Sequence, residues 1–176
     1  MKSVLISIRP QWVEKIARGE KTIEVRKTAP QEVPFKAYIY ETQGQYIKFT
    51  HDAHTKYGYG RGKVIGEFIC DKVDKYPYDY CDGVDIDDDT ILETAIDRED
   101  INIYAKGKTL YGWHISDLKI YNKPKELSEF CIPCKVSCEN CKNPLYFECW
   151  CEEKRKKIVT RPPQSWCYVE DLGEEE

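Results

Sequence analysis

The residues best suited to chemistry lie near the start of the chain, in the octet GEKTIEVR at residues 19–26. Lys21, Glu24 and Arg26 are spaced among apolar and β-branched residues there. If the octet is a strand, its period of two places Glu24 and Arg26 on one face with Thr22, and Lys21 on the other. Such a set can bind phosphate or a base edge, or transfer a proton.

These charges have two interpretations. They can form an ordinary solvated strand face, in which the ion pair between Glu24 and Arg26 contributes about 0–1 kcal/mol. Alternatively, the segment just before them folds over the strand and creates a charged cleft. The octet alone does not decide between the two.

The neighbouring elements favour a shared corner of the fold. Residues 4–8 are expected to form a first strand, and Pro10 suits the first turn of a helix. Apolar residues then recur at helical spacing, and Gly19 is the expected stop. This helix should therefore deliver the chain directly to the Lys21 strand. Its apolar face consists of Trp12, Val13, Ile16 and Ala17.

Two separated blocks resemble the ASCH family, small domains related to the PUA RNA-binding domains. Residues 7–26 resemble the family's opening, and its signature Gly-x-Lys-x-x-Glu-x-Arg is matched at positions 19, 21, 24 and 26. Residues 111–118, YGWHISDL, resemble its aromatic-x-His-Ile/Leu-Ser strand. The resemblance covers most of residues 3–127 and is to stand-alone bacterial and phage members.

The resemblance implies an α+β fold: a PUA-like, mixed, mostly antiparallel β-barrel with short helices. It also implies a cleft where the N-terminal helix meets the Lys21 strand, with RNA or a nucleoside as ligand. Lys21 and Arg26 would then contact phosphate or a base carbonyl. Glu24 would accept from a base amine or hold the two cations, and Ser116 with Arg9 would complete the polar lining.

A second strand is expected to contribute to this site. Residues 109–121 have the pattern of one continuous strand, in which His114 and Ser116 share a face. Both would point into the implied cleft. A structural hydrogen bond in the core is the alternative role for His114.

The resemblance leaves an enzyme as an alternative. Some small ASCH-like proteins are amidohydrolases that remove the acetyl group of N4-acetylcytidine with a lysine, a threonine and a glutamate. Lys21 occupies the place of that lysine, but position 24 is glutamate where the threonine would be. A ribonuclease could instead use Lys21 to stabilise charge and Ser116 or His114 to move a proton. The candidate catalytic set is therefore Lys21, Glu24 and Ser116.

Six of the nine cysteines lie between residues 131 and 151. Four thiolates suit a structural zinc ion, and a set of cysteines alone leaves no open position for catalysis. The expected role is to fold a C-terminal loop that is poor in apolar residues, through a cysteine-rich insertion at about residues 131–151. An interaction module built on this loop is a third class of function. The expected ligands are Cys134, Cys138, Cys141 and Cys151, with Cys149 or Cys131 as substitutes.

Composition sets further limits. The chain has 176 residues, enough for a single domain over residues 1–176, and a formal net charge of −4. A nucleic acid must therefore be bound by a local patch rather than by bulk charge. No apolar run approaches the length of a membrane span, so a cytoplasmic protein with no membrane partner is expected. Trp166, Tyr168 and Val169 are expected to form a last strand that closes the barrel.

Overall fold

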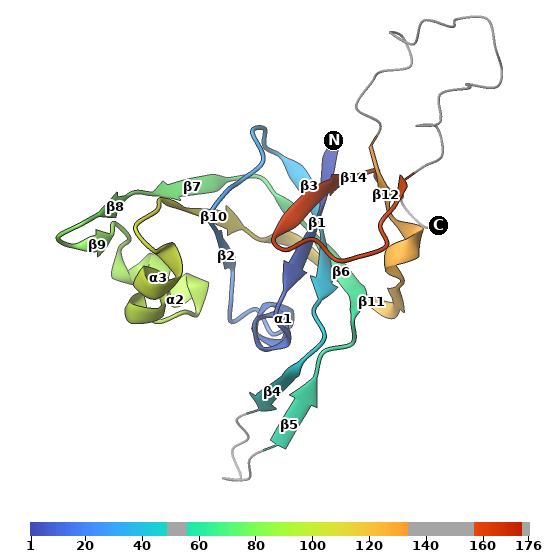
Figure 1. Cartoon of the computed structure of the whole chain (residues 1–176), viewed down its shortest axis with the longest axis horizontal. Coiled ribbons are helices and arrows are strands. Elements are labelled where there is room, and N and C mark those ends of the chain that lie inside the picture. The colour runs from blue at the N-terminus through green and yellow to red at the C-terminus, as the bar shows by residue number, and fades with distance from the viewer. Residues whose placement is uncertain (49–55, 134–156, 174–176) are drawn as a thin grey trace, which may run out of the picture.

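The computed structural model describes residues 1–48, 56–133 and 157–173. A five-stranded sheet with the order β11-β6-β3-β1-β14 forms one body of the fold (Figure 1). β1 and β3 pair in parallel, and the other three pairs are antiparallel. The strands are β1 (Lys2–Ile8), β3 (Phe35–Glu41), β6 (Lys63–Cys70), β11 (Ser116–Lys125) and β14 (Trp166–Val169).

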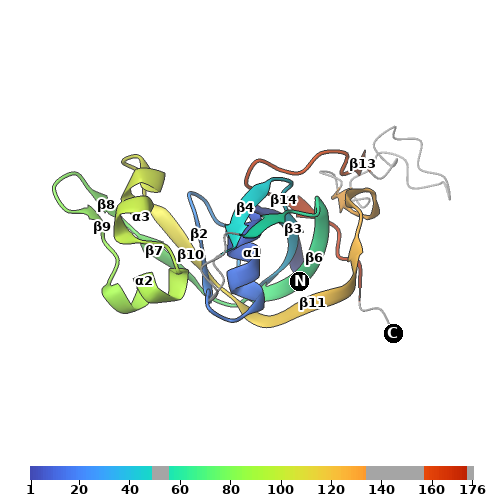
Figure 2. The same cartoon turned by 90° about the horizontal axis from the view of Figure 1, so that it is seen from below.

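A three-stranded antiparallel sheet with the order β2-β10-β7 lies beside it. β2 runs between α1 on one side and α2 and α3 on the other, as two views show (Figures 1 and 2). This arrangement places two helical walls around one strand. The elements are β2 (Ile23–Arg26), β7 (Val73–Tyr76), β10 (Leu110–His114), α1 (Pro10–Ala17), α2 (Asp88–Thr94) and α3 (Arg98–Ala105).

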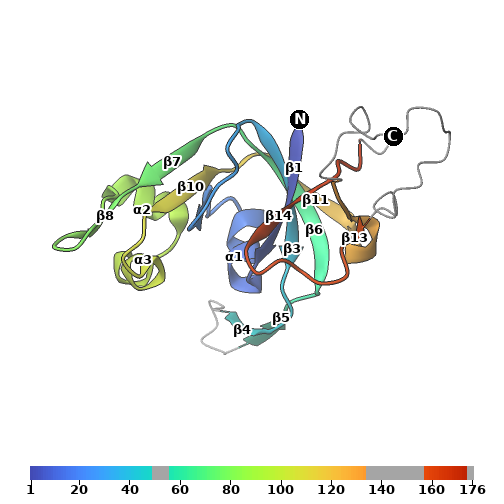
Figure 3. The same ribbon diagram turned by 45° about the horizontal axis from the view of Figure 1, so that its top comes forward.

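Short pairs complete the described structure. The segment between residues 42 and 62 contains the antiparallel pair β4–β5, which projects away from the sheets (Figure 3). The remaining elements are β4 (Gln45–Lys48), β5 (Lys56–Tyr59), β8 (Tyr78–Asp79), β9 (Gly83–Val84), η1 (Leu127–Glu129), β12 (Cys131–Ile132) and β13 (Lys157–Ile158).

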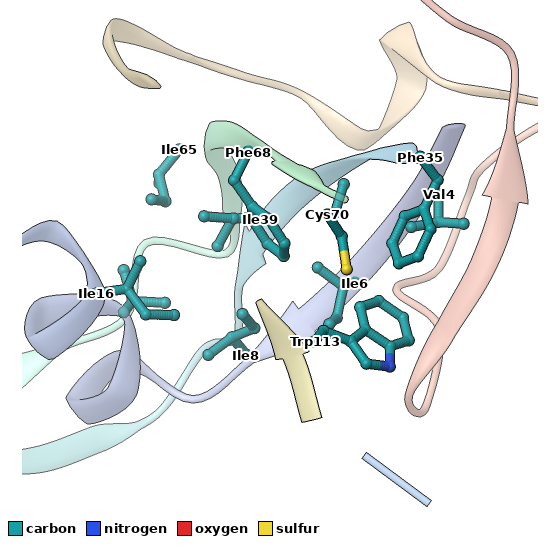
Figure 4. Close-up of a cluster of buried hydrophobic side chains, with 12 residues drawn as sticks. Val4, Ile6, Ile8, Ile16, Phe35, Ile39, Ile65, Phe68, Cys70 and Trp113 are labelled. Atoms are coloured by element: carbon teal, nitrogen blue, oxygen red, sulfur yellow. The ribbon is translucent and has the colours of Figure 1, made fainter. Parts of the chain in front are cut away.

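The main core lies between the five-stranded sheet and α1. Side chains of β1 alternate between two clusters, so that Ile6 joins the core under α1 while Leu5 packs on the opposite face. A strand buried on both faces has an almost continuous apolar sequence, which explains VLISI in β1. Trp113 of β10 inserts into the core against Phe35, with ring centroids 5.0 Å apart (Figure 4). The two sheets are thereby held together.

The expected barrel is only partly reproduced. β14 is the last strand, as expected, and it pairs with β1. Among the described residues, however, the five-stranded and three-stranded sheets are separate and do not close into a barrel. The expected strand over residues 109–121 is divided at Ile115, where the chain leaves β10 for β11. Just after this point, in β11, Asp117 has a positive φ of 47° and the pairing with β6 shifts register between Ser116 and Lys119. The chain thus passes from one sheet to the other.

Within the same residues, no helix is both long enough and apolar enough to cross a membrane.

Candidate functional site

The end of α1 delivers Lys21 to the site. Gly19 has a φ of 72°, and its N–H donates to the carbonyl of Ile16. The N–H of Glu20 donates to the carbonyl of Lys15, which completes a Schellman motif. The left-handed turn reverses the chain within two residues. Lys21 therefore enters the interior immediately before β2 begins.

The Lys21 side chain is fully enclosed, with 0% of its surface exposed. Its ammonium group donates to the carbonyls of Ile23 at 2.8 Å and Thr94 at 2.7 Å. It also lies 3.3 Å from a carboxylate oxygen of Glu24. Burial lowers the pKa of Lys21, and the charge of Glu24 only partly opposes this effect. Lys21 is thus held in place by three oxygen atoms.

Glu24 and Arg26 form the second half of this buried charge cluster. An Arg26 Nη2 lies 2.9 Å from the other Glu24 carboxylate oxygen and donates to the carbonyl of Ser7 at 2.6 Å. Both side chains are at least nine-tenths buried, so the solvated-face interpretation of the octet does not hold. We refer to Lys21, Glu24 and Arg26 as the triad. Two cations share one carboxylate in it.

A pocket of about 910 Å³ opens beside the triad. Four segments form its walls: the β1–α1 junction, β2 with Lys27, the α3 region and the segment at residues 162–165. Ser7 fixes the last of these, because its hydroxyl donates to the carbonyl of Pro163 at 2.6 Å. The polar and aromatic residues that line the pocket include Arg9, Gln11, Trp12, Glu24, Arg26, Lys27, Asp100, Tyr104, Lys106 and Gln164.

Known proteins with this architecture were found only by comparison of structures. No protein-family model and no curated protein matches the sequence. The crystal structure of ASCH from Zymomonas mobilis superposes with a TM-score of 0.54 at 18% identity, covering 96% of this chain and 88% of that one. A mutant of the same protein gives 0.53 at 16% identity, covering 97% and 91%. The chain has the fold of an ASCH domain.

The ASCH fold brings together some of the residues predicted to form the site. Arg9, Glu24 and Arg26 all line the pocket. Lys21 does not, because it lies behind Glu24 and under the ring of Trp12, whose centroid is 5.6 Å from the ammonium nitrogen. The period-of-two assignment failed at Lys21, since this residue precedes the first residue of β2. Its role here is to position the Glu24 carboxylate.

The other two predicted residues lie elsewhere in this ASCH fold. His114 Nε2 is 2.7 Å from a carboxylate oxygen of Asp74 on β7. Burial by itself raises the pKa of Asp74, but the contacts with His114 and Lys72 outweigh it and lower that pKa. The hydroxyl of Ser116 donates to the carbonyl of Ile69 at 2.9 Å. Neither residue lines the pocket, because the break at residue 115 ends the face that they were expected to share.

Sequence reasoning missed the two outer walls of the pocket. Nothing in the sequence of residues 98–105 indicated that Tyr104 would lie near Glu24. Trp12 was assigned only to the apolar face of its helix, although it is half-buried and lines the pocket. Pro162 and Pro163 also line the pocket, and no pattern in the sequence placed them there.

Most of the predicted zinc ligands lie outside the described residues. These are Cys134, Cys138, Cys141, Cys149 and Cys151. Cys131 is described: it is partly exposed, in β12, and pairs with Ile158 of β13. The described residues contain no group of three or more potential metal-ligating side chains.

Proposed function

We propose that this chain binds RNA or a nucleoside in the pocket beside α1. The observation that carries the proposal is the position of the triad, which places the Glu24 carboxylate and the Arg26 guanidinium on the wall of a pocket large enough for a nucleotide. The guanidinium of Arg26 can donate to phosphate or to a base carbonyl. Glu24 can accept from a base amine. The likeness to ASCH structures supports the same class of ligand.

The charges of the lining agree with an anionic ligand. Four cationic side chains, Arg9, Arg26, Lys27 and Lys106, outnumber the two acidic ones, Glu24 and Asp100. This local excess contrasts with the net charge of −4 of the whole chain. A positive pocket on an acidic protein directs a polyanion to one place and disfavours binding elsewhere.

Removal of one rim charge should weaken binding. Arg9 is exposed and lines the pocket, so Arg9→Gln should reduce the affinity for single-stranded RNA by about three- to tenfold, the effect of losing one phosphate contact. Fluorescence anisotropy over a salt series should also give a shallower dependence of affinity on salt. Lys75→Gln is the matched control, because Lys75 is exposed on β7, outside the pocket. Equal effects of both variants would contradict the assignment.

Hydrolysis is the alternative, favoured by one observation. Burial lowers the pKa of Lys21, as a catalytic lysine at neutral pH requires. The Lys21 side chain is fully enclosed and does not line the pocket, so a reaction would need the side chains around it to move. After incubation with the protein, the RNA can be examined for shortened products. An acetylated nucleoside can be incubated in the same way and examined for released acetate. Products that are formed by the wild type but not by Lys21→Met would support a hydrolase function.

We also propose that the cysteine-rich segment at about residues 131–151 binds a structural zinc ion. The pairing of β12 with β13 supports it, because this pairing joins the ends of the cysteine-rich segment and makes it a local insertion. Elemental analysis of protein purified without chelator should give about one zinc per chain. Serine in place of both Cys134 and Cys138 should abolish the bound zinc, whereas Cys81→Ser, at an exposed cysteine outside the segment, should leave it unchanged. Zinc-free wild-type protein would refute the site.

A further inference from the structure

Two aromatic side chains flank the triad from opposite sides of β2. Trp12 comes from α1 and Tyr104 from α3, and β2 lies between these helices (Figures 1 and 2). Both line the pocket. Tyr104 retains 39% of its surface exposed. Aromatic side chains that line a pocket offer large, rigid surfaces for contact with a ligand.

Trp12 is half-buried: it packs against the core under α1 and also lines the pocket. Lys15 and Lys21 place their ammonium nitrogens 5.1 and 5.6 Å from its ring centroid. These nitrogens also donate to the carbonyls of the consecutive residues Ala95 and Thr94, which fixes both cations beside the ring. The part of Trp12 that lines the pocket can contact a ligand.

Tyr104 has a comparable arrangement. The ammonium nitrogen of Lys27 lies 5.0 Å from its ring centroid, a cation–π contact that orients the ring. Burial raises the pKa of the Tyr104 hydroxyl, and the nearby charges of Arg26 and Glu24 affect it in opposite directions. The phenol therefore stays neutral at physiological pH. It can donate a hydrogen bond to a ligand that lies against the triad.

On this basis, and resting on the proposed function, we infer that the pocket receives one unpaired nucleobase of an RNA strand, in contact with Trp12 and Tyr104 and with its polar edge on Glu24 and Arg26. A base in a duplex is stacked on both faces and cannot reach a pocket of this kind without leaving its helix. Arg9 and Lys106 at the rim are placed for the flanking phosphates. The ligand class is thus single-stranded RNA, with the two rings as its specificity determinants.

The test compares ring-removing and ring-retaining variants. Trp12→Leu and Tyr104→Leu should each weaken binding of a labelled single-stranded RNA by about 5- to 100-fold, the range for loss of one base–aromatic contact. Trp12→Phe and Tyr104→Phe should stay within about threefold of wild type. Tyr80→Leu is the control, because Tyr80 is 89% exposed outside the pocket. Thermal unfolding checks that each variant is folded.

Two further ligands complete the experiment. An RNA of the same length with abasic sites should bind at least tenfold more weakly than the intact strand, and a duplex of the same sequence should compete poorly. If the wild type binds RNA but both leucine variants bind equally well, or if the abasic strand binds as tightly, the stacking inference is overturned while the proposed function stands. If the wild type binds neither RNA nor nucleosides, the proposed function itself fails.

Discussion

Replacing Glu24 with alanine is expected to reduce the free energy of unfolding by about 3–5 kcal/mol, the range for breaking a buried ion pair by removing one partner. The carboxylate of Glu24 is the common partner of two buried cations. Without it, the enclosed ammonium group of Lys21 keeps only two carbonyl partners and still experiences the positive charge of Arg26. Urea unfolding at neutral pH measures the loss.

Glu20→Ala is the matched control for this prediction. Glu20 precedes Lys21 in the same turn, but its side chain is 52% exposed and lies 3.8 Å from the exposed Arg18. An exposed pair of this kind contributes little, so the control should change the free energy of unfolding by about 0.5 kcal/mol or less. If Glu24→Ala and Glu20→Ala had equal effects, the triad would not be a buried cluster in solution.

The triad also shows how far sequence reasoning reached. The residues of the signature predicted a charged site beside the first helix, and Glu24 and Arg26 do lie on the wall of a pocket there. The position of Lys21 could not be derived, because it depends on the carbonyl of Thr94, more than 70 residues away. A period of two describes a strand, and Lys21 is the last residue of a turn.

The strand predictions succeeded where burial is continuous and failed where the backbone bends. The strand expected over residues 4–8 is β1, Lys2–Ile8, whose sequence is almost continuously apolar because both its faces are buried. The chain breaks at Ile115 between β10 and β11, and the positive φ of Asp117 follows inside β11. The sequence HISDL contains no glycine to indicate either feature. His114 and Ser116 were therefore assigned to a face that does not exist. The wall formed by α3 depends on packing of its buried residues Ile101 and Ala105 in a cluster with residues of β2, β7 and β10, which periodicity does not encode.

The buried cluster has a consequence for function. Two cations and one carboxylate leave an excess positive charge when Lys21 is protonated, and this excess lies next to the pocket and not in bulk water. Electrostatic attraction is stronger there because the surroundings are less polarisable than water. An anionic group of a ligand near Arg26 would compensate this charge. Ligand binding should therefore stabilise the fold, by an amount that rises with the logarithm of ligand concentration above the Kd.

Replacing Lys21 is the second change with a large expected effect. Lys21→Ala removes a fully enclosed side chain and leaves the carbonyls of Ile23 and Thr94 without their donor, so we expect a loss of about 3–5 kcal/mol in the free energy of unfolding. Lys21→Met keeps the volume and should recover part of that loss, since Glu24 still pairs with Arg26. Lys75→Met, at an exposed site, is the control.

The pH dependence of the free energy of unfolding separates the effect of the Lys21 charge from the effect of its side-chain volume, because Lys21→Met removes the charge and keeps the volume. Burial lowers the pKa of Lys21 in the folded state, so between that pKa and its ordinary value of 10.5 the unfolded chain binds more protons than the folded one. The contribution of Lys21 to stability must therefore increase as the pH rises through this window. Wild-type protein should gain stability relative to Lys21→Met between pH 7 and pH 10 in urea unfolding. A constant difference would show that Lys21 titrates as an ordinary lysine and that the ammonium group is not buried.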